Sequence, residues 1–261
     1  MITAASNSRI KRLVQLNQKS KLRRTEDVFL VEGVKMFLEA PREQLQEVYV
    51  SESFLEKCSC REHLEEVGYE VVSDSVFSKI SDTCTPQGVL CVLKQFHYNI
   101  EEMLRDKAPL FLLLENIQDP GNLGTMLRTG EGAGVSGIIM SRDTVDLYNP
   151  KVIRSTMGSI YRVPFYYADD FAAAVHQVQQ AGVSVYAAHL RGKNSYACQD
   201  YTKGTAFLIG NEGNGLREET AELADCYIRI PMEGKVESLN AAVASSILMY
   251  EAHRQRATIE K

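Results

Sequence analysis

The sequence predicts an α/β protein with a parallel sheet flanked by helices, preceded by a small domain that also mixes strands and helices. After Pro109, compact apolar segments alternate with helical patterns, as in a parallel sheet covered on both faces. Before it, strands and helices are shorter, and residues 96–108 are mixed and polar like a connection. We therefore expect an N-terminal domain over residues 1–95, a linker over 96–108 and a second domain over 109–261.

The composition is that of an ordinary globular protein. Of its 261 residues, 44% are hydrophobic and 24% charged, and the net charge of −5 argues against a wholly basic nucleic-acid-binding protein. No apolar run reaches the roughly 18 residues that cross a membrane, so no membrane contact is expected. The six cysteines lack C-x-x-C spacing and no secretory signal precedes them, which indicates reduced thiols and a cytoplasmic location. Because the five histidines form no H-x-x-x-H pair, we expect no metal site.

The N-terminal domain is expected to contain four short strands and several helices. Residues 8–18 place their apolar side chains at helical spacing, and residues 53–68 also follow a helical pattern. Segments rich in Val, Tyr and Phe predict strands at 28–32, 47–51, 69–73 and 88–94.

The first 24 residues carry seven basic side chains and no acidic one. Such a segment is typical either of a surface that contacts RNA phosphates or of an organellar transit peptide. We favour RNA contact because the segment continues without a break into the apolar run VFLVEG, which is typical of a folded strand. The residues predicted to contact RNA are Arg9, Lys11, Arg12, Arg23 and Arg24.

The second domain is expected to contain five buried strands, at 110–115, 137–141, 183–189, 205–210 and 226–231. Helical patterns separate them at 122–133, 169–182, 215–224 and 238–255. In a parallel sheet, ligands bind beyond the carboxyl ends of the strands, so the loops that follow the strands are the places to look for a site.

Three of these loops carry polar residues. After the first strand, Pro120-Gly121 predicts a turn, Asn122 is expected to cap the next helix, and Arg128 lies almost two turns further on. After the fourth strand comes NEGNGLREE, whose glycines permit close backbone approach; Glu212 lies between two of them, and no Gly-Lys-Ser/Thr follows that would make a phosphate-binding P-loop.

The third loop, EGKVESLN, leads into a helix that is expected to begin with Ser238 and Asn240 and to continue with small residues. Since all three loops follow strands of one sheet, the sequence predicts a site at a single sheet edge. Its expected members are Asn122, Arg128, Glu212, Ser238 and Asn240.

A literal G-x-G-x-x-G spans residues 132–137. In a dinucleotide-binding fold this motif follows a strand and opens a helix, whereas here it ends a helical pattern and precedes a strand. The glycines are therefore interpreted as a helix end and a tight turn, which argues against a nucleotide-dependent enzyme of the doubly wound type.

The three loops, in this order and at these separations, resemble the motifs of the SpoU (TrmH) family of RNA ribose 2′-O-methyltransferases, which belong to the SPOUT class. The resemblance is carried by NIQDPGNLGTMLRTGEGAG, LIGNEGNGL and IPMEGKVESLN, supported by NPKVIRSTMGSIYRVPF, and covers residues 109–257. The N-terminal part resembles, through FLVEG and its strand order, the substrate-binding domain that many members carry. Many members have Val-Ser where this chain has Ala241-Ala242, which puts a secondary contact in doubt.

The resemblance implies a C-terminal trefoil knot, a homodimer, and S-adenosylmethionine as a bent cofactor held largely by backbone groups. The implied RNA substrate is ribosomal RNA in preference to transfer RNA, because of the appended N-terminal domain. A catalytically silent RNA-binding assembly factor stays open as an alternative. Carried onto this sequence, the cofactor-binding residues are Gly210, Asn211, Gly213, Ile230, Met232 and Leu239.

The resemblance also implies roles for the polar residues. The residue that matches Arg128 is often proposed as the general base, but an arginine is always protonated, so we expect Arg128 to position a phosphate and to stabilise the developing alkoxide. Asn122, Ser238 and Asn240 are expected to orient the ribose and Arg128. Glu212 is expected to fix the loop or to accept a hydrogen bond from a substrate hydroxyl.

Overall fold

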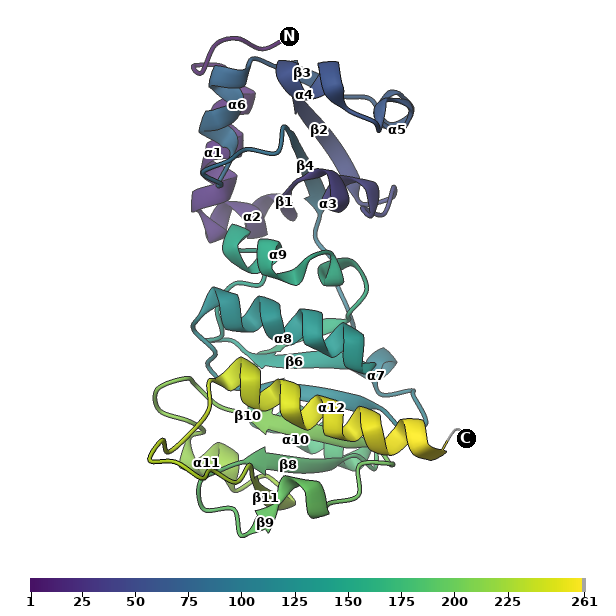
Figure 1. Cartoon of the computed structure of the whole chain (residues 1–261), viewed down its shortest axis with the longest axis vertical. Helices are drawn as coiled ribbons and strands as arrows, with labels where there is room; N and C mark the ends of the chain where they lie inside the picture. Colours follow the sequence, from purple (N-terminus) through teal and green to yellow (C-terminus); the bar gives the residue numbers. More distant parts are fainter. Residues whose placement is uncertain (260–261) are drawn as a thin grey trace. The chain divides into compact units, whose positions relative to one another are not determined.

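A computed structural model describes residues 1–259, and the chain divides into two compact units (Figure 1). The first unit comprises Met1–Phe96 and Asp146–Tyr161, and the second comprises His97–Val145 and the chain from Arg162 onward. Residues 97–108, expected as a linker, thus group with the second unit. Residues 146–161, expected in the second domain, group with the first unit.

The first unit contains a four-stranded sheet in the order β1-β4-β2-β3. Strand β4 is antiparallel to β1 and β2, and β3 is parallel to β2. The strands are β1 (Val28–Glu32), β2 (Leu45–Ser51), β3 (Glu70–Val72) and β4 (Val89–Lys94). The helices are α1 (Ser8–Gln18), α2 (Ser20–Glu26), α3 (Val34–Leu38), α4 (Glu52–Lys57), α5 (Arg61–Val67) and α6 (Asp74–Ile80).

The single helix expected over residues 53–68 is in fact two helices, α4 and α5. Cys58 ends the first of them with extended backbone, at φ −71° and ψ 137°, and α5 begins only at Arg61. The helical pattern holds on either side of this break, but an extended residue interrupts the helix between them.

Residues 146–161 complete the packing of the first unit. They hold α9 (Pro150–Thr156) and the short 3-10 helix η1 (Ser159–Tyr161), and α9 lies against β1. The rings of Phe29 and Tyr148 are 4.7 Å apart between centroids, and the Tyr161 hydroxyl donates to the carbonyl of Met36 at 2.9 Å. These buried contacts explain why the segment belongs to the first unit although it follows it by about 50 residues.

The second unit is built on a seven-stranded sheet in the order β7-β6-β5-β10-β8-β11-β9, in which every pair of neighbours is parallel. The five expected strands are β5 (Leu110–Leu114), β6 (Gly137–Ser141), β8 (Ser184–Ala188), β10 (Thr205–Ile209) and β11 (Cys226–Arg229). Two edge strands were not expected, β7 (Phe165–Ala168) and the two-residue β9 (Asn194–Ser195). The short elements at the edges are too brief to give a clear apolar pattern.

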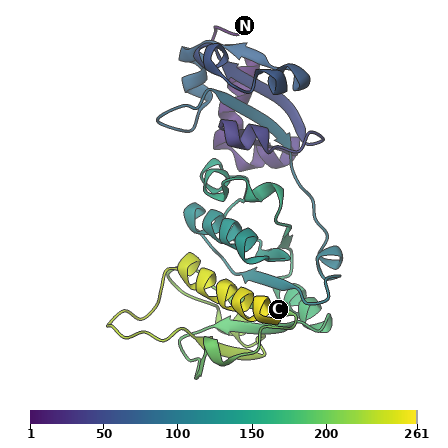
Figure 2. The ribbon, with the colours of Figure 1, turned by 45° about the vertical axis from the view of Figure 1, so that its right-hand side comes forward.

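Helices cover both faces of this sheet, as the sequence predicts. They are α7 (Ile100–Met103), α8 (Pro120–Ala133), α10 (Phe171–Gln180), α11 (Glu218–Ala221) and α12 (Ala241–Ile259), with a 3-10 turn η2 (Tyr196–Cys198). Helices α8 and α12 lie side by side on one face (Figures 1 and 2). Helix α10 packs with Phe111 and Leu113 of β5, whose neighbours along the strand point to the opposite face.

Two helices begin at other residues than expected. Asp119, not Asn122, caps α8: its Oδ1 accepts from the backbone N–H of Asn122 at 2.8 Å, and Pro120 takes the first helical position. The last helix begins at Ala241 and not at Ser238, because the Oδ1 of Asn240 accepts from the N–H groups of Ala242 and Val243 at 2.9 and 3.2 Å. Asn240 therefore holds the cap position.

Within residues 1–259, none of the helices is both long and apolar enough to cross a bilayer.

Candidate active site

Glu212 joins the first two of the three polar loops. Its Oε1 accepts from the backbone N–H of Asp119 at 2.9 Å and from the Nδ2 of Asn122 at 3.0 Å. Its Oε2 accepts from the backbone N–H of Gln118 at 3.0 Å. Burial on its own raises the pKa of Glu212, but these hydrogen bonds together lower it, so the group is an anion at neutral pH.

Asn122 extends this network to the third loop. Its Nδ2 donates to Glu212, and its Oδ1 accepts from the Nδ2 of Asn240 at 3.0 Å. Asn240 uses its own Oδ1 to cap α12. One continuous chain of hydrogen bonds therefore links the loops after β5, β10 and β11, as expected for residues at the carboxyl ends of parallel strands.

The glycine loop after β10 has a fixed shape. Asn211 and Gly215 exchange backbone hydrogen bonds at 3.0 and 2.9 Å, and Gly215 has φ +69°. The Oδ1 of Asn211 accepts from the N–H groups of Gly213 and Asn214, both at 3.0 Å. A Cβ at Gly210 would lie 2.2 Å from the backbone of Gly215 and Leu216, so only glycine fits there.

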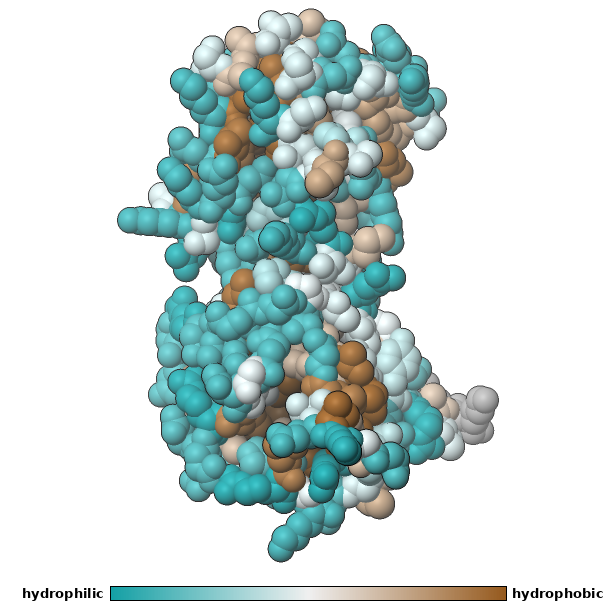
Figure 3. Space-filling view, turned by 60° about the vertical axis from the view of Figure 1, so that its left-hand side comes forward, coloured by the Kyte–Doolittle hydropathy of each residue, from teal (hydrophilic) through white to brown (hydrophobic). Residues whose placement is uncertain are grey.

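The loops enclose a cavity of about 300 Å³, within the size range of small-ligand sites. Ser238 and Glu212 line it, with apolar walls from β10 and β11, and so do all six residues expected to bind the cofactor: Gly210, Asn211, Gly213, Ile230, Met232 and Leu239. On the face shown in Figure 3, apolar side chains gather in a hollow of the second unit, framed by hydrophilic ones. A cavity of this size, with exposed backbone at a glycine, an apolar wall and a carboxylate, fits a nucleoside-bearing sulfonium.

Arg128 is placed differently from the other predicted catalytic residues. It lies on α8, exposed to solvent, and forms no hydrogen bond or ion pair with any other part of the chain that the structure describes. Six residues along a helix turn its side chain about 120° away from that of Asn122. Asn122, Glu212 and Asn240 are thus brought into contact and Ser238 lies at the cavity, whereas Arg128 is exposed on α8 and has no ion pair among residues 1–259.

A second polar cluster, not predicted from the sequence, lies at the same sheet edge. Glu115, which directly follows β5 and is 1% exposed, accepts from the backbone N–H and the Nε of Arg217, both at 2.8 Å. The hydroxyl of Thr220 also donates to it. Arg217 reaches Asp143 with a second nitrogen at 3.2 Å. The signal was a carboxylate at the end of an apolar strand, in the first residue after LFLLL.

His189 was not predicted either. It follows β8, lines the same cavity, and accepts at Nδ1 from the backbone N–H of Arg191 at 3.2 Å. Its position at the end of the apolar segment 183–189, at the same edge of the sheet, was the available signal.

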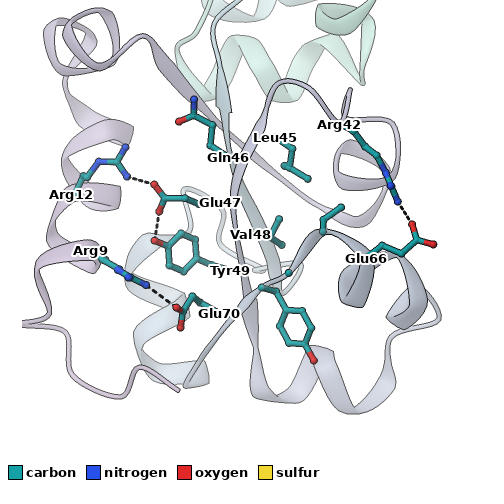
Figure 4. Close-up of a pocket in the computed structure, with 13 residues that line it drawn as sticks. Arg9, Arg12, Arg42, Leu45, Gln46, Glu47, Val48, Tyr49, Glu66 and Glu70 are labelled. Carbon is teal, nitrogen blue, oxygen red and sulfur yellow. Dashed lines mark hydrogen bonds and ion pairs between the residues drawn. The ribbon is translucent and has the colours of Figure 1, made fainter.

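Three of the five residues predicted to contact RNA are paired with carboxylates of the first unit. Arg9 binds Glu70 at 2.8 Å, and Arg12 binds Glu26 and Glu47 at 2.7 and 2.8 Å. Figure 4 shows Arg9 reaching Glu70 and Arg12 reaching Glu47 beside β2, where a pocket of about 610 Å³ opens.

Arg23 is the third of these residues, and its prediction as an RNA contact was wrong. The residue is 3% exposed, and its guanidinium donates to the carbonyls of Leu16 and Asn17 and to Asp146. A phosphate cannot reach it without unfolding the unit. Lys11 and Arg24, by contrast, are exposed and have no ion pair among residues 1–259.

No three His, Cys, Asp or Glu side chains among residues 1–259 are grouped so that they could hold a metal ion.

Comparison with known proteins identifies the family. The model of the SpoU rRNA Methylase family matches residues 109–250, more than half of the chain, and that of the MRM3-like substrate binding domain matches residues 7–91. The chain belongs to the SpoU rRNA methylase family. The family match contains every residue of the three-loop network.

Relatives in this family align over most of the chain. The 23S rRNA (guanosine(2553)-2′-O)-methyltransferase RlmP of Bacillus subtilis is 32% identical, over 95% of this chain and 97% of its own. The 23S rRNA (guanosine-2′-O-)-methyltransferase RlmB of Ralstonia nicotianae is 33% identical, over 69% of this chain and 74% of its own.

Solved structures of the SpoU type share the fold. An AdoMet-bound rRNA methyltransferase from Sinorhizobium meliloti is 31% identical, with a TM-score of 0.84 over 97% of each chain. AviRb from Streptomyces viridochromogenes, in complex with AdoMet, is 26% identical, with a TM-score of 0.87 over 97% of this chain and 99% of its own.

Proposed function

We propose that this protein transfers the methyl group of S-adenosylmethionine to a ribose 2′-hydroxyl of RNA, and that ribosomal RNA is the substrate. The observation that carries the proposal is the hydrogen-bonded chain Glu212–Asn122–Asn240 beside the cavity lined by Gly210 and Leu239. Two relatives that align over more than two thirds of the chain are named as 23S rRNA 2′-O-methyltransferases, and two related structures contain AdoMet.

The cavity supplies the cofactor site. When bound, S-adenosylmethionine supplies a methyl group on a positively charged sulfur; the ribose oxygen forms a bond to that carbon as the carbon–sulfur bond breaks and sulfur keeps the electron pair. Backbone groups around Gly210 approach the ligand closely, because no side chain intervenes. Ile230, Met232 and Leu239 provide the apolar wall.

The network supplies orientation for the ribose. The side-chain amide of Asn122 donates to Glu212 through its nitrogen and accepts from Asn240 through its oxygen. The three side chains are therefore held in position before substrate binds. Glu212 is ionised and exposed, so it can also accept a hydrogen bond from a ribose hydroxyl. Ser238 lies at the cavity with its hydroxyl exposed to solvent.

Arg128 is the cation of the proposed reaction. It holds the phosphate next to the target ribose and stabilises the alkoxide as the 2′-hydroxyl loses its proton to phosphate or water. It has no partner in residues 1–259 that would compete with such a phosphate.

A homodimer and a trefoil knot are part of the proposal. Val243 and Tyr250, seven residues apart on α12, are 48% and 49% exposed, and a second copy would cover them. Strand β10 lies between β5 and β8, both of which precede it in the chain, and the trefoil knot itself stays a prediction from the family resemblance. A cytoplasmic location stays a prediction.

RNA contact by the first unit is also part of the proposal, with a corrected set of residues. Arg9, Arg12 and Arg23 face carboxylates, whereas the other cations of α1, α2 and the residue between them are exposed and have no ion pair among residues 1–259. Lys11 lies opposite the buried face of α1, which is formed by Ile10, Leu13 and Leu16. The cations proposed to meet phosphates are Lys11, Lys19, Lys21 and Arg24.

The test combines binding with site mapping. We expect S-adenosylmethionine to bind in calorimetry in the presence of a chelator, and expect incubation with ribosomal RNA to produce a 2′-O-methyl group at a defined nucleotide that is missing from cells lacking the gene. Cofactor binding without methylation of ribosomal or transfer RNA would favour the silent assembly factor. Failure to bind the cofactor at millimolar concentration would overturn the proposed activity.

The phosphate surface has its own test. Replacing Lys11, Lys19, Lys21 and Arg24 with Gln is expected to lower the slope of log affinity against log salt by about 0.7 to 0.9 for each phosphate that the variant no longer neutralises. The melting temperature and cofactor affinity should stay unchanged, since these side chains have no ion pair within residues 1–259. An unchanged slope in the folded variant would remove the surface from the proposal.

A further inference from the structure

His189 lines the proposed cofactor cavity, and its hydrogen bond defines one tautomer of the neutral ring. It directly follows β8 and lines the cavity together with Gly210 and Leu239. Its Nδ1 accepts a hydrogen bond from the backbone N–H of Arg191 at 3.2 Å, which is possible only if Nδ1 carries no proton. The neutral imidazole therefore carries its single proton on Nε2.

The surroundings of His189 keep the ring neutral. Burial lowers the pKa of His189 and the nearby Arg191 lowers it further, while Glu218 of α11 opposes them. Arg191 is itself paired with Glu218 at 2.5 Å, and the ring of Tyr227 from β11 lies 5.0 Å from that of His189. The other charged side chains that line the cavity are Glu212, Arg229 and Glu237.

We infer that His189 determines which charge state of ligand the cavity accepts: while neutral it admits the cationic sulfonium cofactor, and once protonated it favours the uncharged thioether product. The inference rests on the proposed function and deepens it. S-adenosylmethionine and S-adenosylhomocysteine differ by one methyl group and one positive charge at sulfur. They share the adenosine and the amino-acid end, so titrations that act through these shared parts affect both alike, and His189→Gln separates the contribution of His189 from that of the carboxylates Glu212 and Glu237.

The size of the cavity makes the interaction strong. A sphere of about 300 Å³ is about 8 Å across, close to the Debye length at physiological salt, so salt weakens the repulsion between a protonated His189 and a cationic ligand there only in part. At that separation and an effective dielectric constant of about 20 to 40, repulsion between a protonated His189 and the sulfonium raises the dissociation constant of the cofactor by about sixfold to thirtyfold. Acidification should therefore make the enzyme retain product and release cofactor.

The direct measurement is the ratio of the two dissociation constants, cofactor over product, determined by calorimetry on the full chain between about pH 7.5 and 5.5. We expect this ratio to rise at least about fivefold on acidification in the wild type. In His189→Gln, which keeps an amide donor but cannot titrate, the ratio should change less than about twofold. His176→Gln is the matched control, because His176 is exposed on α10, outside the cavity lining, and forms a hydrogen bond with Gln179; it should behave as the wild type.

A ratio that stays flat in the wild type, or that still rises in His189→Gln, would overturn the inference while leaving the methyltransferase proposal intact. Absence of binding by both ligands at every pH would instead remove the proposed function.

Should His189→Gln fail to fold, the wild type still decides the question. The His189 ring resonance can be assigned by elimination, using Gln variants of the other four histidines, and titrated with each ligand. The cofactor should lower the pKa of His189 relative to the product; equal values for the two complexes would contradict the inference.

Discussion

The two units differ in whether residues that are separate in the sequence, or close in it, end in the same surroundings. In the second unit, Asn122, Glu212 and Asn240 come from loops about 90 and 30 residues apart and meet in one hydrogen-bonded chain. In the first unit, a basic segment only 24 residues long is divided, so that some cations face carboxylates and others face solvent. A parallel sheet brings the carboxyl ends of its strands to one edge, whichever side chains follow them. Whether a cation on a helix is paired or exposed depends instead on which residues pack beside that helix.

Two arginines show the same contrast. Arg128 is exposed with no partner in residues 1–259, while Arg23 is buried and bound to two carbonyls and Asp146. Changing each should therefore affect a different quantity, the rate for one and the free energy of unfolding for the other.

The largest effect is expected from Arg128→Ala. Methyl transfer should fall by about two to three powers of ten, because the reacting oxygen loses the cation that is proposed to stabilise it. Cofactor affinity should change little, since Arg128 does not line the cavity. Single-turnover methylation and calorimetry measure the two quantities separately.

Arg128→Lys provides the control for charge. It should recover little activity, because an ammonium cannot form the planar two-point contact of a guanidinium with phosphate. A rate within about threefold of wild type in Arg128→Ala would remove Arg128 from the mechanism. Loss of cofactor binding would give it a structural role instead.

The second largest effect is expected from Arg23→Gln. Removing the guanidinium leaves the partly buried Asp146 without its ion-pair partner and breaks the hydrogen bonds to two carbonyls, one of them buried, which should destabilise the first unit by about 3 kcal/mol. Its neighbour supplies the matched control: Arg24→Gln changes an exposed side chain and should cost less than about 0.5 kcal/mol. Urea unfolding followed by circular dichroism would compare them, and equal midpoints would contradict the buried role of Arg23.

The sequence predicts the strands of both units, all four in the first and five of the seven in the second. In the second unit, the five expected strands and the edge at which the polar loops meet follow from apolar runs and glycines, because strand order does not change which end of a parallel strand is the carboxyl end. The cap of α8 was missed because Asp119 and Asn122 are both good caps, and only Pro120 at the first helical position decides between them.

The partners of the basic segment could not be predicted. Glu47 lies 35 residues from Arg12 and Glu70 lies 61 residues from Arg9, and Asp146 is more than 120 residues from Arg23. The segment 146–161 carries no pattern that assigns it to the first unit; only its packing against β1 and Phe29 does so. Such contacts depend on tertiary packing and not on local periodicity.

A smaller effect is expected from Asn240→Ala, which tests the network of the second unit. The change removes the cap of α12 and the donor to Asn122, and should lower stability by about 1 kcal/mol. Asn240→Asp keeps the capping oxygen but cannot donate to Asn122, so it should restore stability and not the methylation rate. Equal rates in wild type and Asn240→Asp would mean that the bond to Asn122 has no part in the reaction.

The smallest effect is expected from Arg9→Gln. Arg9 forms one ion pair, with Glu70, in which both side chains are about half exposed, at 57% and 46%. Water and salt screen such a pair, so its loss should leave the unfolding midpoint unchanged within error. Because Glu70 already neutralises Arg9, the variant should also leave the salt dependence of RNA binding as it is, in contrast to Lys11→Gln on the outer face of the same helix. A salt slope that falls as much for Arg9→Gln as for Lys11→Gln would show that RNA displaces Glu70, and that pairing in the free protein does not decide which cations meet phosphate.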